Sequence, residues 1–253
     1  MILAIDHLVV LVEDLAEAVE DYEALGFHVS PGGEHTDGAT HNALISFADG
    51  TYLELLAFKA EAAGHRWWRH RAAGEGLIDF ALLPGAVEAD VAAARARGLP
   101  IVGPVPGGRE RPDGVRIEWQ TALADPPELP FLCGDVTPRE LRVPEPGHHG
   151  NGASGIFRVT VAVRDVSASA AHYAALLGAA PLVEPGRRLF KLGAAYIALQ
   201  EPGAGALERA AVEARLERRG EGIASVALRR DGFATVPRTL DLELTHGVRM
   251  VIA

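Results

Sequence analysis

The chain has 253 residues, 48% of them apolar, and a single cysteine; it is long enough for one or two domains with a sizeable core and cannot form an internal disulfide. Its 34 acidic and 24 basic residues give a formal net charge of -10, which disfavours binding to nucleic acid and to anionic membranes. The longest apolar runs are far shorter than the roughly 20 residues that cross a bilayer, and the first residues lack a signal-peptide pattern. We therefore expect a cytoplasmic protein that binds neither nucleic acid nor membranes.

The first part of the chain predicts a strand, a helix and three more strands. Apolar and β-branched residues at 5–12 indicate a strand, Asp14 is placed to cap a helix, and Gly26 ends that helix. Three further apolar segments follow, at residues 27–30, 41–47 and 51–58. A turn of sequence Ala-Asp-Gly separates the last two. This order predicts a βαβββ unit.

This beginning is repeated later in the chain. Residues 156–176 align with residues 5–25 without a gap, and both copies run from an apolar strand through an aspartate into a helix. The identical pairs are Ile5/Ile156, Val10/Val161, Val12/Val163, Asp14/Asp165, Tyr22/Tyr173, Ala24/Ala175 and Leu25/Leu176. The repeat predicts a second unit of the same kind in the second half.

Two weaker copies complete the pattern. One starts at 77–83, continues through a helix at 87–98 and closes with strands at 115–122 and 129–136. The other starts at 222–230 and looks short, because a segment at 241–250 is the only other strand-like sequence before the final residues. Four βαβββ units, the last one truncated, are therefore expected.

A stretch rich in proline and glycine divides the chain. Residues 142–154 have no apolar periodicity and predict a linker between a first module at 1–141 and a second, degenerate module at 155–253. A single βαβββ unit leaves one sheet face bare, so units are expected to pair. The predicted fold class is α+β, with tandem units pairing into cupped, barrel-like mixed sheets. The truncated last unit would leave an edge needing cover, which makes the second half a structural partner of the first or a homodimer contact.

Three residues of the first unit could bind a metal. His7 lies in an apolar strand, with Ile5, Val9 and Leu11 on its face, and His41 opens a strand on the face of Ala43 and Ile45. Glu54 shares its face with Tyr52, Leu56 and Phe58, where an unpaired carboxylate is costly. Two imidazoles and a carboxylate suit Zn, Fe, Mn, Ni or Co. The residues alone leave open a structural role, in which hydrogen bonds satisfy both histidines and Glu54 pairs with one of them.

Other residues could bind a substrate. Arg109 and Arg111 fall in a glycine-rich segment that predicts a loop, where guanidinium groups could clamp a carboxylate or phosphate; a solvated turn is the alternative. Trp119 lies on a strand of the second unit and could line its cavity or fill the core. His149, in the linker, could lie over the cavity mouth or be solvated. Cys133 follows an apolar run and is expected to be buried and inert.

The ordered motifs resemble a known family. They are IDHLVVLVEDLAEAVEDYEALGF, THNALISF, TYLELLAF, GxRxRPDGxxxxW from Gly107 to Trp119, ELPFL at 128–132 and HGNGASGI at 149–156. Together they are similar to the glyoxalase-like proteins of the vicinal-oxygen-chelate superfamily, over nearly the first 200 residues. The resemblance implies metal ligands in the first and fourth strands of a unit, positions held here by His7 and Glu54.

The resemblance also marks a departure. Superfamily sites usually draw two ligands from each of two paired units, but the positions equivalent to His7 and Glu54 in the other copies hold no ligand. They are Phe80, Arg158 and Ser225 for His7, and approximately Leu132 and Ala198 for Glu54. His41, water or substrate would complete the site and leave an open coordination position.

Two functions follow as expectations. One is a metal-dependent enzyme, a lyase, isomerase or dioxygenase, that acts on a small substrate with vicinal oxygens and uses a divalent ion of unspecified identity. The general base of such an enzyme is not identified. The other is a metal-free protein of the bleomycin-resistance type, which binds or sequesters a small molecule.

Overall fold

The computed structural model describes residues 1–204, 208–230 and 236–253. The first half contains two βαβββ units in succession. Their elements are β1 (Ile2–Leu11), α1 (Leu15–Ala24), β2 (Ser30–His35), β3 (Thr40–Ser46), β4 (Tyr52–Phe58), η1 (Trp68–Ala73), β5 (Gly76–Pro84), α2 (Val87–Ala96), β6 (Ile101–Glu110), β7 (Arg116–Ala124), β8 (Phe131–Asp135) and the short α3 (Arg139–Arg142).

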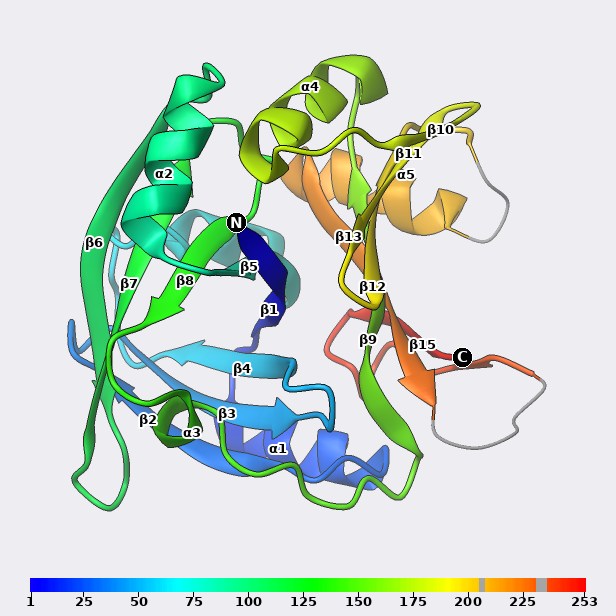
Figure 1. Cartoon of the computed structure of the whole chain (residues 1–253). Coiled ribbons are helices and arrows are strands. Elements are labelled where there is room, and N and C mark those ends of the chain that lie inside the picture. Colours follow the sequence, from blue (N-terminus) through cyan, green and yellow to red (C-terminus); the bar gives the residue numbers. More distant parts are fainter. Residues whose placement is uncertain (205–207, 231–235) are drawn as a thin grey trace.

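The two units close into a barrel. The strand order is β1-β4-β3-β2-β6-β7-β8-β5, and it returns to β1 (Figure 1). Strand β1 pairs in parallel with β4, β5 pairs in parallel with β8, and β1 and β5 run antiparallel to each other. Within the unit, β2–β3–β4 is an antiparallel meander. Closure gives the barrel an interior face, which holds the polar site described below.

The second half is an open sheet. Its elements are β9 (Ala153–Ala162), α4 (Val166–Leu177), β10 (Leu182–Glu184), β11 (Arg187–Leu192), β12 (Ala195–Gln200), α5 (Arg209–Arg219), β13 (Gly222–Arg230), β14 (Arg238–Thr239) and β15 (Arg249–Ile252). The strand order is β10-β11-β12-β9-β13-β15-β14. The predicted fold class, α+β with mixed sheets built from βαβββ units, is confirmed. The last unit is short, as predicted, although residues 242–247 form turns rather than strand.

The repeated aspartates begin the two equivalent helices. Asp14 Oδ1 accepts hydrogen bonds from the backbone amides of Ala16 and Glu17. Asp165 Oδ1 accepts from the amides of Ser167 and Ala168 in the same way. Each carboxylate satisfies two amides that the helix itself leaves without partners.

The repeated tyrosines join the two halves. Tyr22 and Tyr173 have no exposed surface. The hydroxyl of Tyr22 donates to the carbonyl of Thr245 at 3.1 Å, and that of Tyr173 donates to the carbonyl of Glu128 at 2.7 Å. Each tyrosine therefore reaches from its own half into the other, and one continuous apolar core contains residues of both halves.

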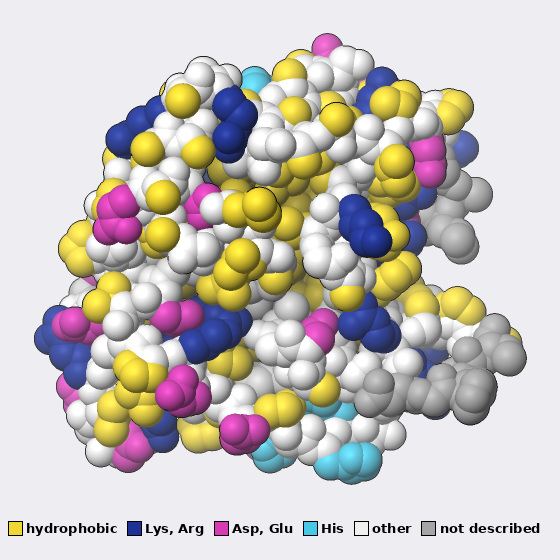
Figure 2. All heavy atoms as spheres, viewed as in Figure 1, with side chains coloured by type: hydrophobic (Ala, Val, Ile, Leu, Met, Phe, Trp, Pro, Cys, Tyr) yellow, Lys and Arg dark blue, Asp and Glu magenta, His cyan; other side chains and the backbone are white. Residues whose placement is uncertain are grey.

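The surface of this assembly carries charges of both signs. On the face drawn in Figure 2, acidic and basic side chains are interspersed, and hydrophobic side chains gather at the seam between the barrel and the second sheet. None of the described helices is long and apolar enough to cross a membrane.

Candidate functional site

The barrel interior contains a cavity of about 410 Å³. One part of its wall is apolar and aromatic, with Trp67, Trp119 and Phe131. The other part is polar and gathers groups that ionise or donate hydrogen bonds. These are His7, His35, Asn42, Glu54, Arg109 and Arg142. A concave apolar wall with a few convergent polar groups is the usual form of a small-molecule site.

His7 and Glu54 face each other inside the barrel. Both are almost fully buried, with 3% and 4% exposure. Nε2 of His7 lies 3.5 Å from Oε2 of Glu54. The neighbouring interior positions Val9 and Leu11 lie on the predicted face of His7, but Ile5 joins the main core outside the barrel. The β1–β5 pairing is irregular between residues 5 and 7, and this irregularity interrupts the alternation.

His35 is the second histidine beside Glu54. It ends β2, and its Nε2 lies 3.5 Å from Oε1 of the glutamate. Its Nδ1 is 2.7 Å from the hydroxyl oxygen of Thr40. Burial lowers the pKa of His35 below its ordinary value, although the charge of Glu54 opposes that effect. The imidazole is therefore held neutral, the form in which a histidine binds a metal.

His41 does not join this group. Strand β3 turns Thr40 and Asn42 toward the cavity, and alternation places His41 on the opposite face with Ala43. Ala43 packs into the core outside the barrel, and His41 lies half-buried opposite Glu34 in the β2–β3 ladder. The structure thus brings together two of the three expected ligands and adds His35, which sequence reasoning did not identify.

Asp6 holds His7 from behind. Its Oδ2 lies 2.7 Å from Nδ1 of His7, and its carboxylate also pairs with the guanidinium groups of Arg142 and Arg139. Burial alone would raise the pKa of Asp6, but Arg142, His7 and Arg139 outweigh it and hold this pKa far below its usual range. The Asp6 carboxylate fixes the ring so that Nε2 is directed at Glu54, an arrangement that commonly supports a metal-binding histidine.

Glu54 remains ionised despite its burial. Burial by itself raises its pKa, but His35, His7, a hydrogen bond from Asn42 and the charge of Arg109 together lower it. Asn42 Nδ2 donates to Oε1 of Glu54 at 2.6 Å, and Asn42 Oδ1 accepts from Nη1 of Arg109 at 3.0 Å. The amide therefore links the buried guanidinium to the carboxylate.

The donor set can be compared with the needs of a divalent ion. Two ligands about 2.1 Å from a tetrahedral ion lie about 3.4 Å apart, and each imidazole nitrogen lies 3.5 Å from the carboxylate. Both Nδ1 atoms are engaged elsewhere, which leaves the Nε2 atoms facing Glu54. In the present side-chain positions, however, no three His, Cys, Asp or Glu side chains among the described residues are arranged to hold one ion. The donor chemistry fits a divalent ion, and the three side chains would have to close in on it.

Sequence comparison decides the family. The profile of the family described as "Glyoxalase-like domain" matches residues 5–177, which include both halves of the barrel and the helix of the third unit. The chain belongs to this glyoxalase-like family. The resemblance to the vicinal-oxygen-chelate superfamily is thereby confirmed. The search of curated proteins finds no match.

Solved structures extend the likeness to the whole chain. A hypothetical protein from Staphylococcus aureus is 16% identical, with a TM-score of 0.77 over 100% of this chain and 99% of that chain. A mutant 4-hydroxymandelate synthase from Streptomyces coelicolor is 15% identical, with a TM-score of 0.59 over 92% of this chain and 72% of that one. A methylmalonyl-CoA epimerase from the same organism matches 54% of this chain and 100% of its own, at 25% identity and a TM-score of 0.43. The first two likenesses concern the fold.

The remaining predicted binding residues of this glyoxalase-like protein lie in different places. Arg109 is not in a loop: β6 extends through it, and it is buried against the cavity with 3% exposure. Trp119 lines the same cavity, edge-on to His35 at 5.9 Å. Arg111 lies beyond the end of β6 and pairs with Asp113 at 2.8 Å. It is not among the residues that line the cavity.

His149 has a structural position. It is 7% exposed, and its ring packs against Phe27 and Phe47 outside the barrel. Its Nδ1 accepts from the backbone amide of His28, which leaves Nε2 to donate to the carbonyl of Ser46. The residue therefore fastens the segment between the halves and is not among the residues that line the cavity.

The second half replaces the cavity with a helix. On the sheet face equivalent to the barrel interior, Val212 and Leu216 of α5 pack against Ala162 and Ala224. Arg158, which stands at the position of His7, forms an ion pair with Glu208 just before the helix. Helix α5 therefore covers this face of the second sheet, whereas the corresponding face of the barrel lines the cavity.

Proposed function

We propose that the chain is a metal-dependent glyoxalase-like enzyme whose barrel cavity binds a small substrate with vicinal oxygens. The proposal rests on one observation, that a buried and a half-buried imidazole direct Nε2 at opposite oxygens of Glu54 while Asp6 and Thr40 engage their Nδ1 atoms. His7, His35 and Glu54 would hold a divalent ion, of which Zn, Fe, Mn, Ni and Co are the candidates. When bound, such an ion supplies Lewis acidity at a substrate oxygen.

Arg109 would position the substrate. Its guanidinium is buried at the cavity wall, Nη1 donates to Asn42, and Nη2 donates to the carbonyl of Arg142. Its Nε has no hydrogen-bond partner among the residues that the structure describes. A buried charge next to a cavity, with one donor unused, suits an anionic oxygen of a substrate. We therefore assign Arg109 to substrate orientation and to stabilisation of negative charge.

The aromatic wall would keep water away from the reacting oxygens. Trp67 and Phe131 lie edge to face at 5.9 Å, with the guanidinium of Arg66 over both rings. Trp119 packs against the same apolar cluster and stands edge-on to His35. In such an enclosure, charges act more strongly than in bulk water. Lyase, isomerase and dioxygenase chemistry are all consistent with two histidines and one carboxylate.

A metal-free binding protein is the second candidate. It is favoured by the way the described residues already compensate Glu54, with two imidazoles, the Asn42 amide and the Arg109 charge around one carboxylate. It is also favoured by the absence of a ready three-ligand arrangement among residues 1–204, 208–230 and 236–253. In this case the cavity would hold a small molecule by its aromatic wall and Arg109.

Elemental analysis of untagged protein by inductively coupled plasma mass spectrometry separates the two candidates. A matched pair of variants, His35→Gln and His41→Gln, tests the ligand set. We expect close to one equivalent of a transition metal in the wild type and in His41→Gln, and loss of most of it in His35→Gln. Wild-type protein without metal that also takes up none when dialysed against each candidate ion would overturn the enzyme proposal and support the binding protein.

A further inference from the structure

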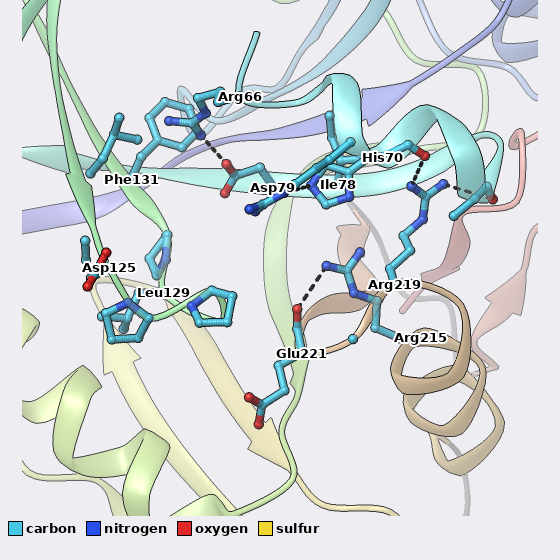
Figure 3. Close-up of a pocket in the computed structure, with 18 of the residues that line it drawn as sticks. Arg66, His70, Ile78, Asp79, Asp125, Leu129, Phe131, Arg215, Arg219 and Glu221 are labelled. Carbon is cyan, nitrogen blue, oxygen red and sulfur yellow. Dashed lines mark hydrogen bonds and ion pairs between the residues drawn. The ribbon is translucent and has the colours of Figure 1, made fainter. Parts of the chain in front are cut away.

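A second cleft lies at the seam between the barrel and the second half. Its volume is about 720 Å³, and it is bounded by η1 and β5 of the barrel, the connection between β7 and β8, and the end of α5 (Figure 3). Five arginines line it, together with three acidic residues. They are Arg66, Arg69, Arg215, Arg218 and Arg219, with Asp79, Asp125 and Glu221.

Most of this positive charge has no acidic partner. Among the residues that the structure describes, only Arg66 of the five has an acidic partner, because it pairs with Asp79. The guanidinium groups from α5 donate instead to backbone carbonyls: Arg219 to that of His70 at 2.8 Å, and Arg218 to that of Ala73 at 2.8 Å. Within the described parts of the chain, neither forms an ion pair. Figure 3 shows the Arg219 side chain crossing from α5 to η1.

Arg215 is the buried centre of the cluster. It is 7% exposed, Nη1 donates to the carbonyl of Leu77 at 3.0 Å, and Nη2 donates to the carbonyl of Glu221 at 3.1 Å. Its Nε has no hydrogen-bond partner, and it forms no ion pair within the described residues. Figure 3 shows it pointing from α5 into the cleft. Burying a charge in this way is costly unless an opposite charge joins it.

The arginine cluster also lowers the pKa values of neighbouring basic groups. Burial, with the charges of Arg215, Arg69 and Arg219, lowers the pKa of His70 to about 3. Burial and the charge of Arg219 lower the pKa of Arg215 to about 10. The residues that line the cleft thus carry an excess of positive charge, five arginines against three acidic residues, although the whole chain carries a net charge of -10.

We propose that this cleft binds a small molecule through an oxyanion group with two or more negative charges, a phosphoryl or polycarboxylate group. Arg215 offers an unused donor and Arg69 and Arg218 offer exposed guanidinium groups at the rim. The ligand contacts both the barrel and α5, because the arginines that line the cleft come from both. This cleft adjoins the barrel cavity, with which it shares Arg66, Leu123 and Phe131, but His7, His35 and Glu54 do not line it.

Calorimetric titration with inorganic pyrophosphate at constant ionic strength tests the proposal. We expect saturable binding at one site, with affinity at least about tenfold weaker in Arg215→Gln and in Arg69→Gln, since each removes charge-assisted hydrogen bonds. Arg209→Gln is the matched control, because Arg209 is exposed on the same helix and does not line the cleft. Its affinity should equal that of the wild type.

Three outcomes would overturn the proposal. They are the absence of saturable binding, equal weakening by Arg209→Gln and Arg69→Gln, and loss of pyrophosphate binding in Glu54→Gln, which would place the anion in the barrel. Arg69 is exposed, so Arg69→Gln keeps the test decisive if Arg215→Gln does not fold. This titration does not measure metal content. Its result therefore does not decide the proposal that the barrel site binds a metal, which the elemental analysis tests.

Discussion

His7 and Glu54 meet inside the barrel, on the adjacent strands β1 and β4, although they are not direct partners in the β1–β4 ladder. His7 stands opposite Tyr52, and Glu54 stands opposite Val9, two residues further along β1. The offset of two residues leaves both side chains on the interior face, since alternation has a period of two. A slip of one residue between these strands would turn one of them outward. The polar site therefore depends on the register of this parallel pair.

Replacing Gly32 should damage the site through β2. A Cβ atom there would lie 1.9 Å from Oδ1 of Asn42 and 2.7 Å from Nη1 of Arg109. Asn42 would have to move, and Glu54 would lose its amide donor. We expect Gly32→Ala to lower the free energy of unfolding by about 1–3 kcal/mol and to weaken metal or ligand binding. Gly64→Ala, where a Cβ meets nothing within 4 Å, is the control for chemical denaturation. Equal stabilities of the two variants would contradict the packing argument.

The buried pair of Asp6 and Arg142 should be important for stability. Asp6 is fully buried, and Arg142 donates to it and to the hydroxyl of Tyr52. Arg142→Met leaves a buried carboxylate with one fewer counter-charge, and we expect a loss of about 3–5 kcal/mol. Arg139→Met, which removes the more exposed partner of Asp6, should cost about 1 kcal/mol. Urea unfolding of both variants measures the difference, and a smaller loss for Arg142→Met than for Arg139→Met would refute the assignment.

The same pair predicts how stability depends on pH. The pKa of Asp6 in the folded state lies far below its ordinary value of 3.8. The unfolded chain therefore binds this proton more readily, and stability falls as the pH falls. The contribution of Asp6 should be complete above about pH 5 and should decline steadily below pH 3.8. Unfolding free energies from pH 5 to pH 2.5 should show a steeper slope for the wild type than for Arg142→Met.

Most of the fold could be predicted because the repeat marks it. The apolar strands and the aspartate caps follow local rules, and both occur twice. Three of the departures from the sequence expectation are β2, which lies at 30–35 and not at 27–30, β6, which runs through the segment expected to be a loop, and α5. Strand β2 begins with Ser-Pro-Gly-Gly, residues that rarely indicate a strand, and only its pairing with β3 and β6 fixes it there. Helix α5 was missed because its sequence is highly charged, and its burial depends on the second sheet.

The site could be predicted only in part, because the barrel face and the pairing of distant strands also decide which side chains meet. His7 and Glu54 lie in strongly apolar strands, where a polar residue stands out. His41 was correctly grouped with Ala43 and Ile45, but alternation does not say which face becomes the barrel interior. That face carries Asn42 instead. His35 gave no signal, because its place beside Glu54 results from a non-local pairing of β2.

The Cys133 thiol should be unreactive in the folded protein. It is 3% exposed, and burial raises its pKa to about 12, although Arg142 opposes this effect. At pH 8 the thiol would therefore be almost entirely protonated, and the thiolate is the reactive form. We expect negligible labelling by Ellman's reagent in native buffer and one equivalent in guanidinium chloride. Rapid labelling of the native protein would show that the cavity opens to reagents of this size.

Leu216 tests whether α5 has taken the place of a second cavity. It is 7% exposed and packs with Val212 against Ala162 and Ala224 on the face that corresponds to the barrel interior. If this face is a packed core, Leu216→Ala should cost about 2–4 kcal/mol, because the methyl groups lose their contacts and leave a void. Glu217→Ala, on the exposed side of the same helix, should change stability by less than about 0.5 kcal/mol. Urea unfolding measures both. A cost below 0.5 kcal/mol for Leu216→Ala would mean that the helix rests loosely on the sheet, and the face beneath it would then have to be considered a second binding site.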